Sequence, residues 1–176
     1  KIVFLPFPKR KTSLKRILFI GLAEMGSNIL ARDAIERIRS SYPDAQIYFL
    51  VFEENQEAVR LFTNIEGLSI LAIRNTNFWT LFIDTLKFLW RANRVHFDAV
   101  IDMELFSRYS SLLSYGSGAK IRVGFCGYAI RGLYRGDLHT HRVQFNPHKH
   151  ISQNFMALAS ALSEDPGDSP LLKRKL

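Results

Sequence analysis

A strand, a glycine-bearing turn and a helix follow one another in residues 16–43, and this stretch constrains the fold more than any other. Ile17 to Ile20 form a short, wholly apolar run, which is typical of a strand in a parallel sheet covered on both faces. The turn comes next, and apolar residues then recur at helical spacing as far as Ile38. Open α/β sheets bind ligands outside the carboxyl ends of their strands, so the first predicted site is Glu24 to Asn28.

The turn has two interpretations, which are compatible with each other. In the structural one, Gly26 turns the chain and the Ser27 hydroxyl caps the following helix. In the functional one, free backbone N–H groups at the start of that helix, beside Asn28, bind an anion or a polar substrate. The turn matches neither a P-loop nor a GxGxxG motif, so it gives no argument for a nucleotide phosphate at this point.

Strand and helix patterns alternate along the rest of the chain. Further strands are expected at residues 46–52, 68–73, 97–102, 120–125 and 141–145, and helices at 53–62, 77–93, 105–115 and 151–162. The alternation predicts an α/β fold, namely a Rossmann-like parallel sheet with helices on both faces. A length of 176 residues suits one domain. We assign a basic leader to residues 1–16, the domain to 17–163 and a linker to 164–176.

The expected helix at residues 77–93 is unusually aromatic. Phe78, Trp79, Phe82 and Trp90 all belong to it, and Asp84 interrupts any apolar span. Such a face either lies on a lipid surface or packs in the core or against another subunit. We expect the core.

The formal net charge of +8 is concentrated at the ends of the chain. Nine of the 24 basic residues lie in residues 1–16 and 173–175, and the remaining body is close to neutral. A nucleic-acid-binding function is therefore not expected, whereas basic ends suit an anionic membrane surface or are simply solvated. Residues 105–163 contain seven basic residues and one acid, which favours an anionic substrate.

Several polar residues are candidates for binding or chemistry. Asp102 ends a predicted strand, where sites form, although it is equally suited to cap the next helix or to pair with Arg108. Glu24 is a candidate general base, and otherwise a solvated loop acid. Four arginines would bind phosphate or carboxylate, or else line a solvated loop: Arg122, Arg131, Arg135 and Arg142. Four histidines are expected on the surface or facing a phosphate: His139, His141, His148 and His150. No metal site is expected, because no cysteine or carboxylate cluster completes a ligand shell.

Three segments together resemble the heptosyltransferase-like glycosyltransferases of family 9. They are ILFIGLAEMGSNILARDAIERIRSSYPDAQIYFLV, FDAVIDMELFSRYSSLLSYGSGAKIRVGF and RGLYRGDLHTHRV, the last followed by the helix after His150. They occur in the family's order and cover most of Ile17 to Leu162. The resemblance implies a GT-B architecture, in which two Rossmann-like domains enclose the active site. This chain resembles the N-terminal, acceptor-binding domain, and the donor-binding domain has no counterpart in it.

The resemblance also implies an activity and its partners. The family transfers heptose from ADP-heptose to the lipopolysaccharide inner core with inversion and with no metal or other cofactor in the catalytic step. The expected partners are a nucleotide-sugar donor, held by the second domain, and an anionic glycolipid or oligosaccharide acceptor. The expected location is the cytoplasm, peripheral to the inner face of the cytoplasmic membrane. The chain alone is expected to be inactive.

One departure from the family concerns the turn. The family usually has Gly-Asp there, with the aspartate resembling the general base, and this chain has Gly26-Ser27. An arginine also often stands where this chain has Gly21. Either Glu24 replaces the base, or the acceptor chemistry differs, or the domain is a non-catalytic module that binds an anionic partner or membrane.

Overall fold

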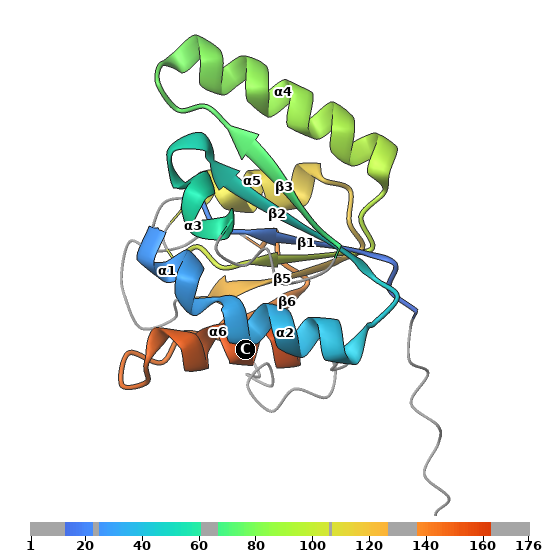
Figure 1. Ribbon diagram of the computed structural model, residues 1–176, viewed down its shortest axis with the longest axis vertical. Helices are drawn as coiled ribbons and strands as arrows, with labels where there is room; N and C mark the ends of the chain where they lie inside the picture. Colours follow the sequence, from blue (N-terminus) through green and yellow to red (C-terminus); the bar gives the residue numbers. More distant parts are fainter. Residues whose placement is uncertain (1–12, 23–24, 61–66, 106, 127–136, 163–176) are drawn as a thin grey trace, which may run out of the picture.

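A single parallel sheet forms the centre of the molecule in this computed structural model (Figure 1). The structure describes residues 13–22, 25–60, 67–105, 107–126 and 137–162, apart from the side chains of residues 25, 27 and 58. The sheet has six strands in the order β3-β2-β1-β4-β5-β6, and every neighbouring pair is parallel. The strands are β1 (Arg16–Ile20), β2 (Gln46–Phe52), β3 (Leu68–Ile73), β4 (Ala99–Asp102), β5 (Ile121–Cys126) and β6 (His141–Gln144). The predicted Rossmann-like sheet is confirmed.

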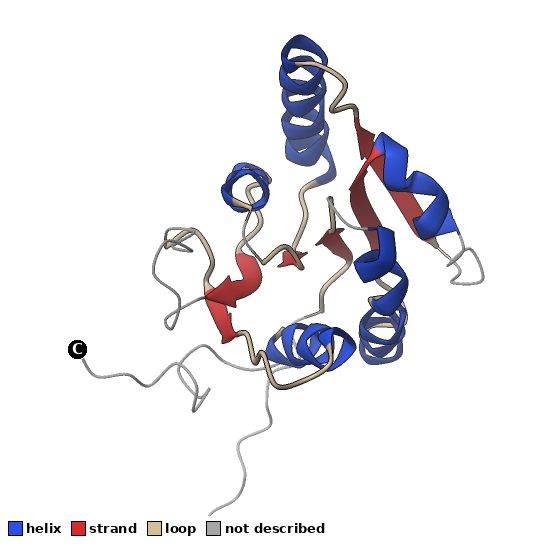
Figure 2. Ribbon diagram, turned by 90° about the vertical axis from the view of Figure 1, so that its left-hand side faces the viewer, coloured by secondary structure: helices blue, strands red, loops and turns tan. Residues whose placement is uncertain are grey.

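Helices cover both faces of the sheet, as Figures 1 and 2 show. Successive strand residues point to opposite faces, so Ile17 and Phe19 pack in one core cluster and Leu18 and Ile20 in the other. All four are fully buried, which explains why the strand is apolar throughout. One face is covered by α1 (Met25–Leu30), α2 (Arg32–Ser41), α3 (Gln56–Arg60) and α6 (Ile151–Ala161), and the other by α4 (Phe78–Val95) and α5 (Arg108–Gly116). A 3-10 turn, η1 (Glu53–Asn55), precedes α3.

The first helix differs from the sequence prediction. The single predicted helix is broken at Ala31 into α1 and α2, and the exposed fractions of Ile29 and Leu30 are 44% and 37%. Asn28 is the buried residue instead, at 1% exposure. The helix begins at Met25, so Ser27 lies inside α1 and is not its cap. Gly26 also lies inside α1, exposed, with open space where a side chain would stand.

The long helix α4 corrects a second prediction. It begins at a capping box, in which the Asn77 side chain accepts a hydrogen bond from the backbone N–H of Thr80 (2.9 Å). Its buried residues are Asp84, Phe88 and Ala92, which face the sheet. The aromatic residues at its start are exposed, so the expectation that this face belongs to the core is wrong.

An ion pair joins α4 to the end of β3. Arg74 directly follows β3, and its Nε and Nη2 atoms donate to the Asp84 carboxylate at 2.7 and 2.9 Å. Lys87 lies 3.3 Å from the same carboxylate. The hydrogen bonds from the Arg74 guanidinium hold the pKa of the Asp84 carboxyl well below its usual range, although burial opposes this. The pair therefore holds the first half of α4 against the end of β3.

We expect Asp84→Asn to lower the free energy of unfolding at pH 7 by about 1 kcal/mol, because it weakens a charge-assisted pair that is partly open to solvent. Since the folded-state pKa of Asp84 is depressed, its contribution is fully present above the ordinary aspartate value of about 4 and declines as the pH falls below it. Urea titrations of both proteins at pH 7 and pH 3 measure the difference. Glu36→Gln, which breaks the exposed pair with Arg32, is the control and should change little. A difference of the same size at both pH values would contradict the role of the Asp84 charge.

Candidate functional site

The candidate site lies where the order of the sheet reverses. The chain winds outward from β1 in one direction through β2 and β3, and in the other direction from β4 through β5 and β6. The carboxyl ends of β1 and β4 lie side by side, with Ile20 opposite Asp102 in the parallel register. Open α/β sheets bind ligands in the crevice outside such a switch point. Of the predicted site residues, Asn28, Asp102 and His139 lie at or beside this edge.

Asp102 is the centre of a buried polar cluster at the end of β4. Its side chain is fully buried. Its Oδ2 accepts a hydrogen bond from Ser110 Oγ (3.0 Å) and lies 3.1 Å from His139 Nε2, while its Oδ1 accepts from the backbone N–H of Glu104 (3.1 Å). A carboxylate can only accept, so the Nε2 hydrogen of His139 points to Asp102. The serine and the histidine both bond to the carboxylate, an arrangement that orients side chains and does not activate a nucleophile.

The ring of His139 fits beside β5 because residue 124 is a glycine. A Cβ atom on Gly124 would stand 2.5 Å from the Cδ2 and Nε2 atoms of the ring, which is too close for any side chain. Gly124 is the register partner of Asp102 on the neighbouring strand. The missing side chain on β5 thus creates the space that brings His139 to the carboxylate.

The loop after β1 is held by three side chains from different parts of the chain. Asn28 Nδ2 donates to the carbonyl oxygen of Gly21 (3.1 Å), and Asn55 Nδ2 donates to that of Leu22 (2.9 Å). The backbone N–H of Leu22 donates to Glu104 Oε1 (2.6 Å). Gly21 is closely packed, because a Cβ there would meet the Oδ1 of Asn28. The backbone is therefore fixed up to the point where the predicted turn begins.

The other predicted site residues have different outcomes. Glu24, Arg131 and Arg135 lie outside the described residues, so their roles stay predictions. The side chain of Ser27 is likewise not described. Arg108 is exposed at the first position of α5.

The remaining histidines and arginines have structural contacts. His139 and His141 are 5% and 6% exposed, so the expectation of surface histidines is wrong for these two. His150 is exposed and caps α6 through Ser152. Within the described part of the chain, no group of three or more His, Cys, Asp or Glu residues could hold a metal ion. Two of the four candidate arginines bond within the fold: Arg122 donates to the carbonyl oxygens of Leu138 (2.7 Å) and Ala119 (2.6 Å), and Arg142 pairs with Asp137 (2.6 Å).

Comparison with known proteins shows which solved structures have this fold. No family model matches the sequence, and no curated protein matches it. Solved structures do match. A family 9 glycosyltransferase from Veillonella parvula has a TM-score of 0.63 at 19% identity, over 93% of this chain and 45% of its own. The ADP-heptose lipopolysaccharide heptosyltransferase II of E. coli has a TM-score of 0.64 at 17% identity, over 89% and 45%.

A third match is the E. coli heptosyltransferase WaaC, solved with ADP-2-deoxy-2-fluoro heptose, with a TM-score of 0.69 at 13% identity over 89% of this chain and 51% of its own. The chain has the fold of one half of these glycosyltransferases. It spans about half the length of the solved structures that it matches. The TM-scores show a shared fold, and at identities below 20% the likeness extends to the fold alone.

Sequence reasoning missed three residues that support this edge of the sheet. Ser110 lies in a run of serines and leucines that predicts only a helix, whereas Glu104 and Asn55 each come within three residues of a strand end. Polar residues just after parallel strands were therefore the available signal for Glu104 and Asn55. Ser110 gave no such signal, because it lies inside α5 and bonds to a carboxylate eight residues earlier in the sequence.

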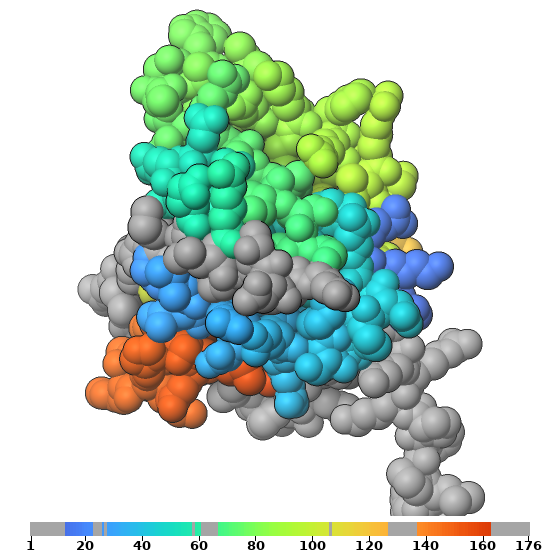
Figure 3. All heavy atoms as spheres, viewed as in Figure 1, coloured from blue at the N-terminus to red at the C-terminus, as the bar shows by residue number. Residues whose placement is uncertain are grey.

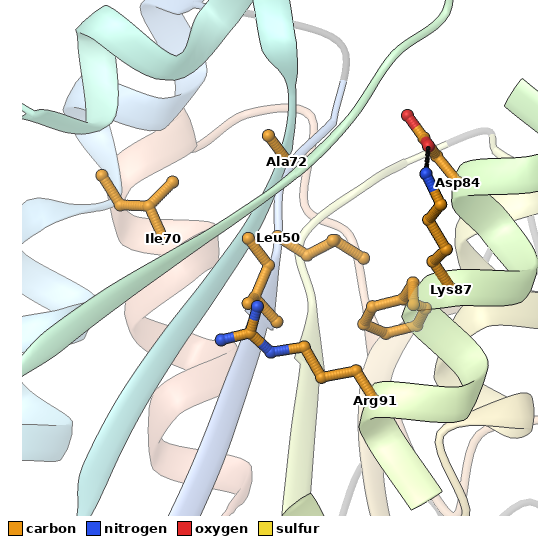
Figure 4. A pocket seen from close by; sticks show the side chains of 8 residues that line it. Leu50, Ile70, Ala72, Asp84, Lys87 and Arg91 are labelled. Carbon is orange, nitrogen blue, oxygen red and sulfur yellow. Dashed lines mark hydrogen bonds and ion pairs between the residues drawn. The ribbon is translucent and has the colours of Figure 1, made fainter. Parts of the chain in front are cut away.

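A cavity among the described residues lies elsewhere. It has a volume of about 240 Å³ between α4 and the strands β2 and β3. Figure 4 shows Arg91 reaching from α4 toward the strands, with Lys87 and Asp84 along the same helix. None of the predicted site residues lines it, and it lies on the α4 side of the sheet, beneath the helix.

We expect Ser110→Ala to lower the free energy of unfolding by about 1–3 kcal/mol, because a buried carboxylate loses one of its donors. Ser114→Ala is the matched control. Ser114 is fully buried in the same helix, but its hydroxyl has no hydrogen-bond partner among the described residues, so its removal should cost nothing. Thermal or urea unfolding of the two variants distinguishes these outcomes. Equal losses would show that the Asp102 cluster contributes no more than the packing of α5.

Proposed function

We propose that this chain is the acceptor-binding half of an inverting glycosyltransferase that builds a lipopolysaccharide core or another cell-surface glycan. The observation that carries the proposal is the structural match, over 82–93% of this chain, with about half of each of two heptosyltransferases and a family 9 glycosyltransferase. A second half would bind the nucleotide-sugar donor, with heptose from ADP-heptose as the first candidate. The reaction would take place at the cytoplasmic face of the membrane.

The geometry at the switch point supports a division of roles. Asp102 and His139 are buried and bonded to each other, so they position the edge of the sheet and leave acceptor contact to neighbouring groups. Asn28 holds the backbone of the β1 loop in the same way. The chemistry then falls to the adjoining segment, residues 23–28, and to exposed cations such as Arg108.

The proposed mechanism is a single displacement. Glu24 removes the proton from the acceptor hydroxyl, and that oxygen attacks the anomeric carbon of the donor sugar from the face opposite the leaving nucleotide diphosphate. Inversion follows from attack on that face. Ser27, at the family's aspartate position, hydrogen-bonds the acceptor, with Gly26 leaving open space beside it. Arg108, Arg131 and Arg135 would bind acidic sugars or phosphates of the acceptor, because a planar guanidinium binds such groups through two hydrogen bonds.

A second candidate is a non-catalytic glycosyltransferase-like module that binds an anionic partner. The observation that favours it is the serine at position 27, because an unassisted hydroxyl is a poor base at neutral pH. The two candidates differ in whether a protein that contains both halves turns over a nucleotide sugar.

In a protein that joins this chain to its donor-binding half, Glu24→Gln should lower kcat by roughly 100-fold or more, because an amide cannot accept the hydroxyl proton. Adding Ser27→Asp to that variant should restore part of the rate by placing a carboxylate at the family's position. The measurement is nucleotide diphosphate release with acceptor present, and Glu57→Gln on the exposed side of α3 is the control. Unchanged turnover in Glu24→Gln would remove Glu24 as the base. The 176-residue chain by itself should show no transfer.

Replacing Arg131 and Arg135 together by alanine should weaken binding of a phosphorylated acceptor, and the loss should shrink as salt is raised, because screening weakens the attraction. Arg32→Ala is the control, since Arg32 is an exposed arginine that pairs with Glu36 on α2. Calorimetric titration at low and high salt measures the effect. Equal affinities of the double variant and the unmodified protein at low salt would exclude these arginines from the acceptor site.

A further inference from the structure

The outer side of α4 presents a continuous apolar face to solvent. Its six large side chains are 46–70% exposed: Phe78, Trp79, Phe82, Ile83, Leu86 and Trp90. At the helical spacing of 3.6 residues per turn, they fall within an arc of about 140° and run along most of the helix. In the space-filling view the residues of α4 form one edge of the molecule (Figure 3). An apolar face of this extent on a described surface marks an interaction site.

Cations border this face along one side. Lys87 and Arg94 follow the apolar arc around the helix and are exposed, whereas Arg91 reaches from α4 toward the strands. The guanidinium of Arg94 lies 3.9 Å from the ring centroid of Trp90, so charge and aromatic surface meet directly. The sole acid of α4, Asp84, is buried and paired with Arg74 and Lys87. The border of the apolar face is thus basic with no exposed acid on the helix itself.

The opposite side of α4 is already occupied by the sheet. Phe88 and Ala92 are 5% and 0% exposed in the core cluster that contains Leu18 and Ile20. Turning the helix to bury its outer face would expose these residues and break the ion pair with Arg74. The outer face is therefore a fixed feature of the fold, available to a partner outside the described residues.

We propose that this face of α4 docks on the surface of an anionic lipid bilayer, with the helix lying in the plane of the membrane. Tryptophan and phenylalanine side chains would enter the headgroup boundary, where such amphipathic rings are favoured, and Lys87 and Arg94 would contact lipid phosphates. The basic border selects this occupant, because a second copy of the chain would bring the same cations together. None of the described helices is long and apolar enough to cross a membrane. The inference does not depend on the proposed glycosyl transfer.

The chain contains its own probe for this docking. Both of its tryptophans, Trp79 and Trp90, lie on the face and are more than half exposed. Adding vesicles of phosphatidylcholine with phosphatidylglycerol to the 176-residue chain should shift tryptophan emission to shorter wavelength, and brominated lipids should quench it. Vesicles of phosphatidylcholine alone should bind at least tenfold more weakly, because each cation near an anionic surface contributes about fivefold. No shift with the anionic vesicles would overturn the proposal.

Variants separate the α4 face from the basic ends of the chain. Phe82→Ser with Leu86→Ser should weaken vesicle binding by roughly tenfold per side chain, whereas Leu112→Ser, at a residue of α5 that is 60% exposed, should not. Lys87→Gln with Arg94→Gln should weaken binding by about fivefold per charge. Unchanged binding in the first pair would assign the membrane contact to the basic ends and overturn the proposal. A second outcome would also overturn the proposal: a shift of tryptophan emission to shorter wavelength that appears without lipid as protein concentration rises and is absent in the Phe82→Ser, Leu86→Ser variant. That result would identify a second copy of the chain as the occupant. All these measurements are made without donor or acceptor, so they fail or succeed independently of the transferase assay.

Discussion

The buried carboxylate of Asp102 is the constraint on which the candidate site depends. Removing a carboxylate from water costs several kcal/mol unless hydrogen bonds replace the lost hydration. The donors here come from α5, from the segment before β6 and from the loop after β4. These segments must therefore assemble together before the end of β4 is stable. The edge of the sheet at the switch point is rigid because its most costly group is satisfied only in the complete fold.

At the same edge, hydrogen bonds hold the backbone that leads into the predicted site. The backbone of Leu22 is bonded at both its N–H and its carbonyl group, by Glu104 and Asn55. The predicted site, Glu24 to Asn28, begins two residues later in the sequence. A rigid scaffold that carries different sites on its loops is common among α/β folds. The departure from the resembling family at Ser27 falls inside α1, on the helix that follows this fixed backbone.

The strands were predictable from sequence because they are buried on both faces, which leaves an unbroken apolar run such as Ile17 to Ile20. The first helix was less predictable. Asn28 takes a buried position that periodicity gives to an apolar residue, because it bonds to the carbonyl oxygen of Gly21 seven residues earlier. The burial of His139 could not be foreseen either, since it requires the space beside Gly124 and a carboxylate 37 residues away in sequence. Periodicity identifies an apolar face but does not show whether other elements cover that face. The aromatic face of α4 was therefore wrongly assigned to the core.

The position of α4 relates the two proposals to each other. The helix follows β3, and all strands are parallel, so Phe78 and Trp79 begin at the end of the sheet where the carboxyl ends of β1 and β4 also lie. A bilayer in contact with the outer face of α4 would thus reach the end of the molecule where the candidate site lies. An acceptor anchored in that bilayer by lipid would diffuse in two dimensions to the edge of the sheet where Asp102 and Asn28 lie. Membrane docking through α4 would then raise the local concentration of a glycolipid acceptor without any direct contact between α4 and the reacting groups.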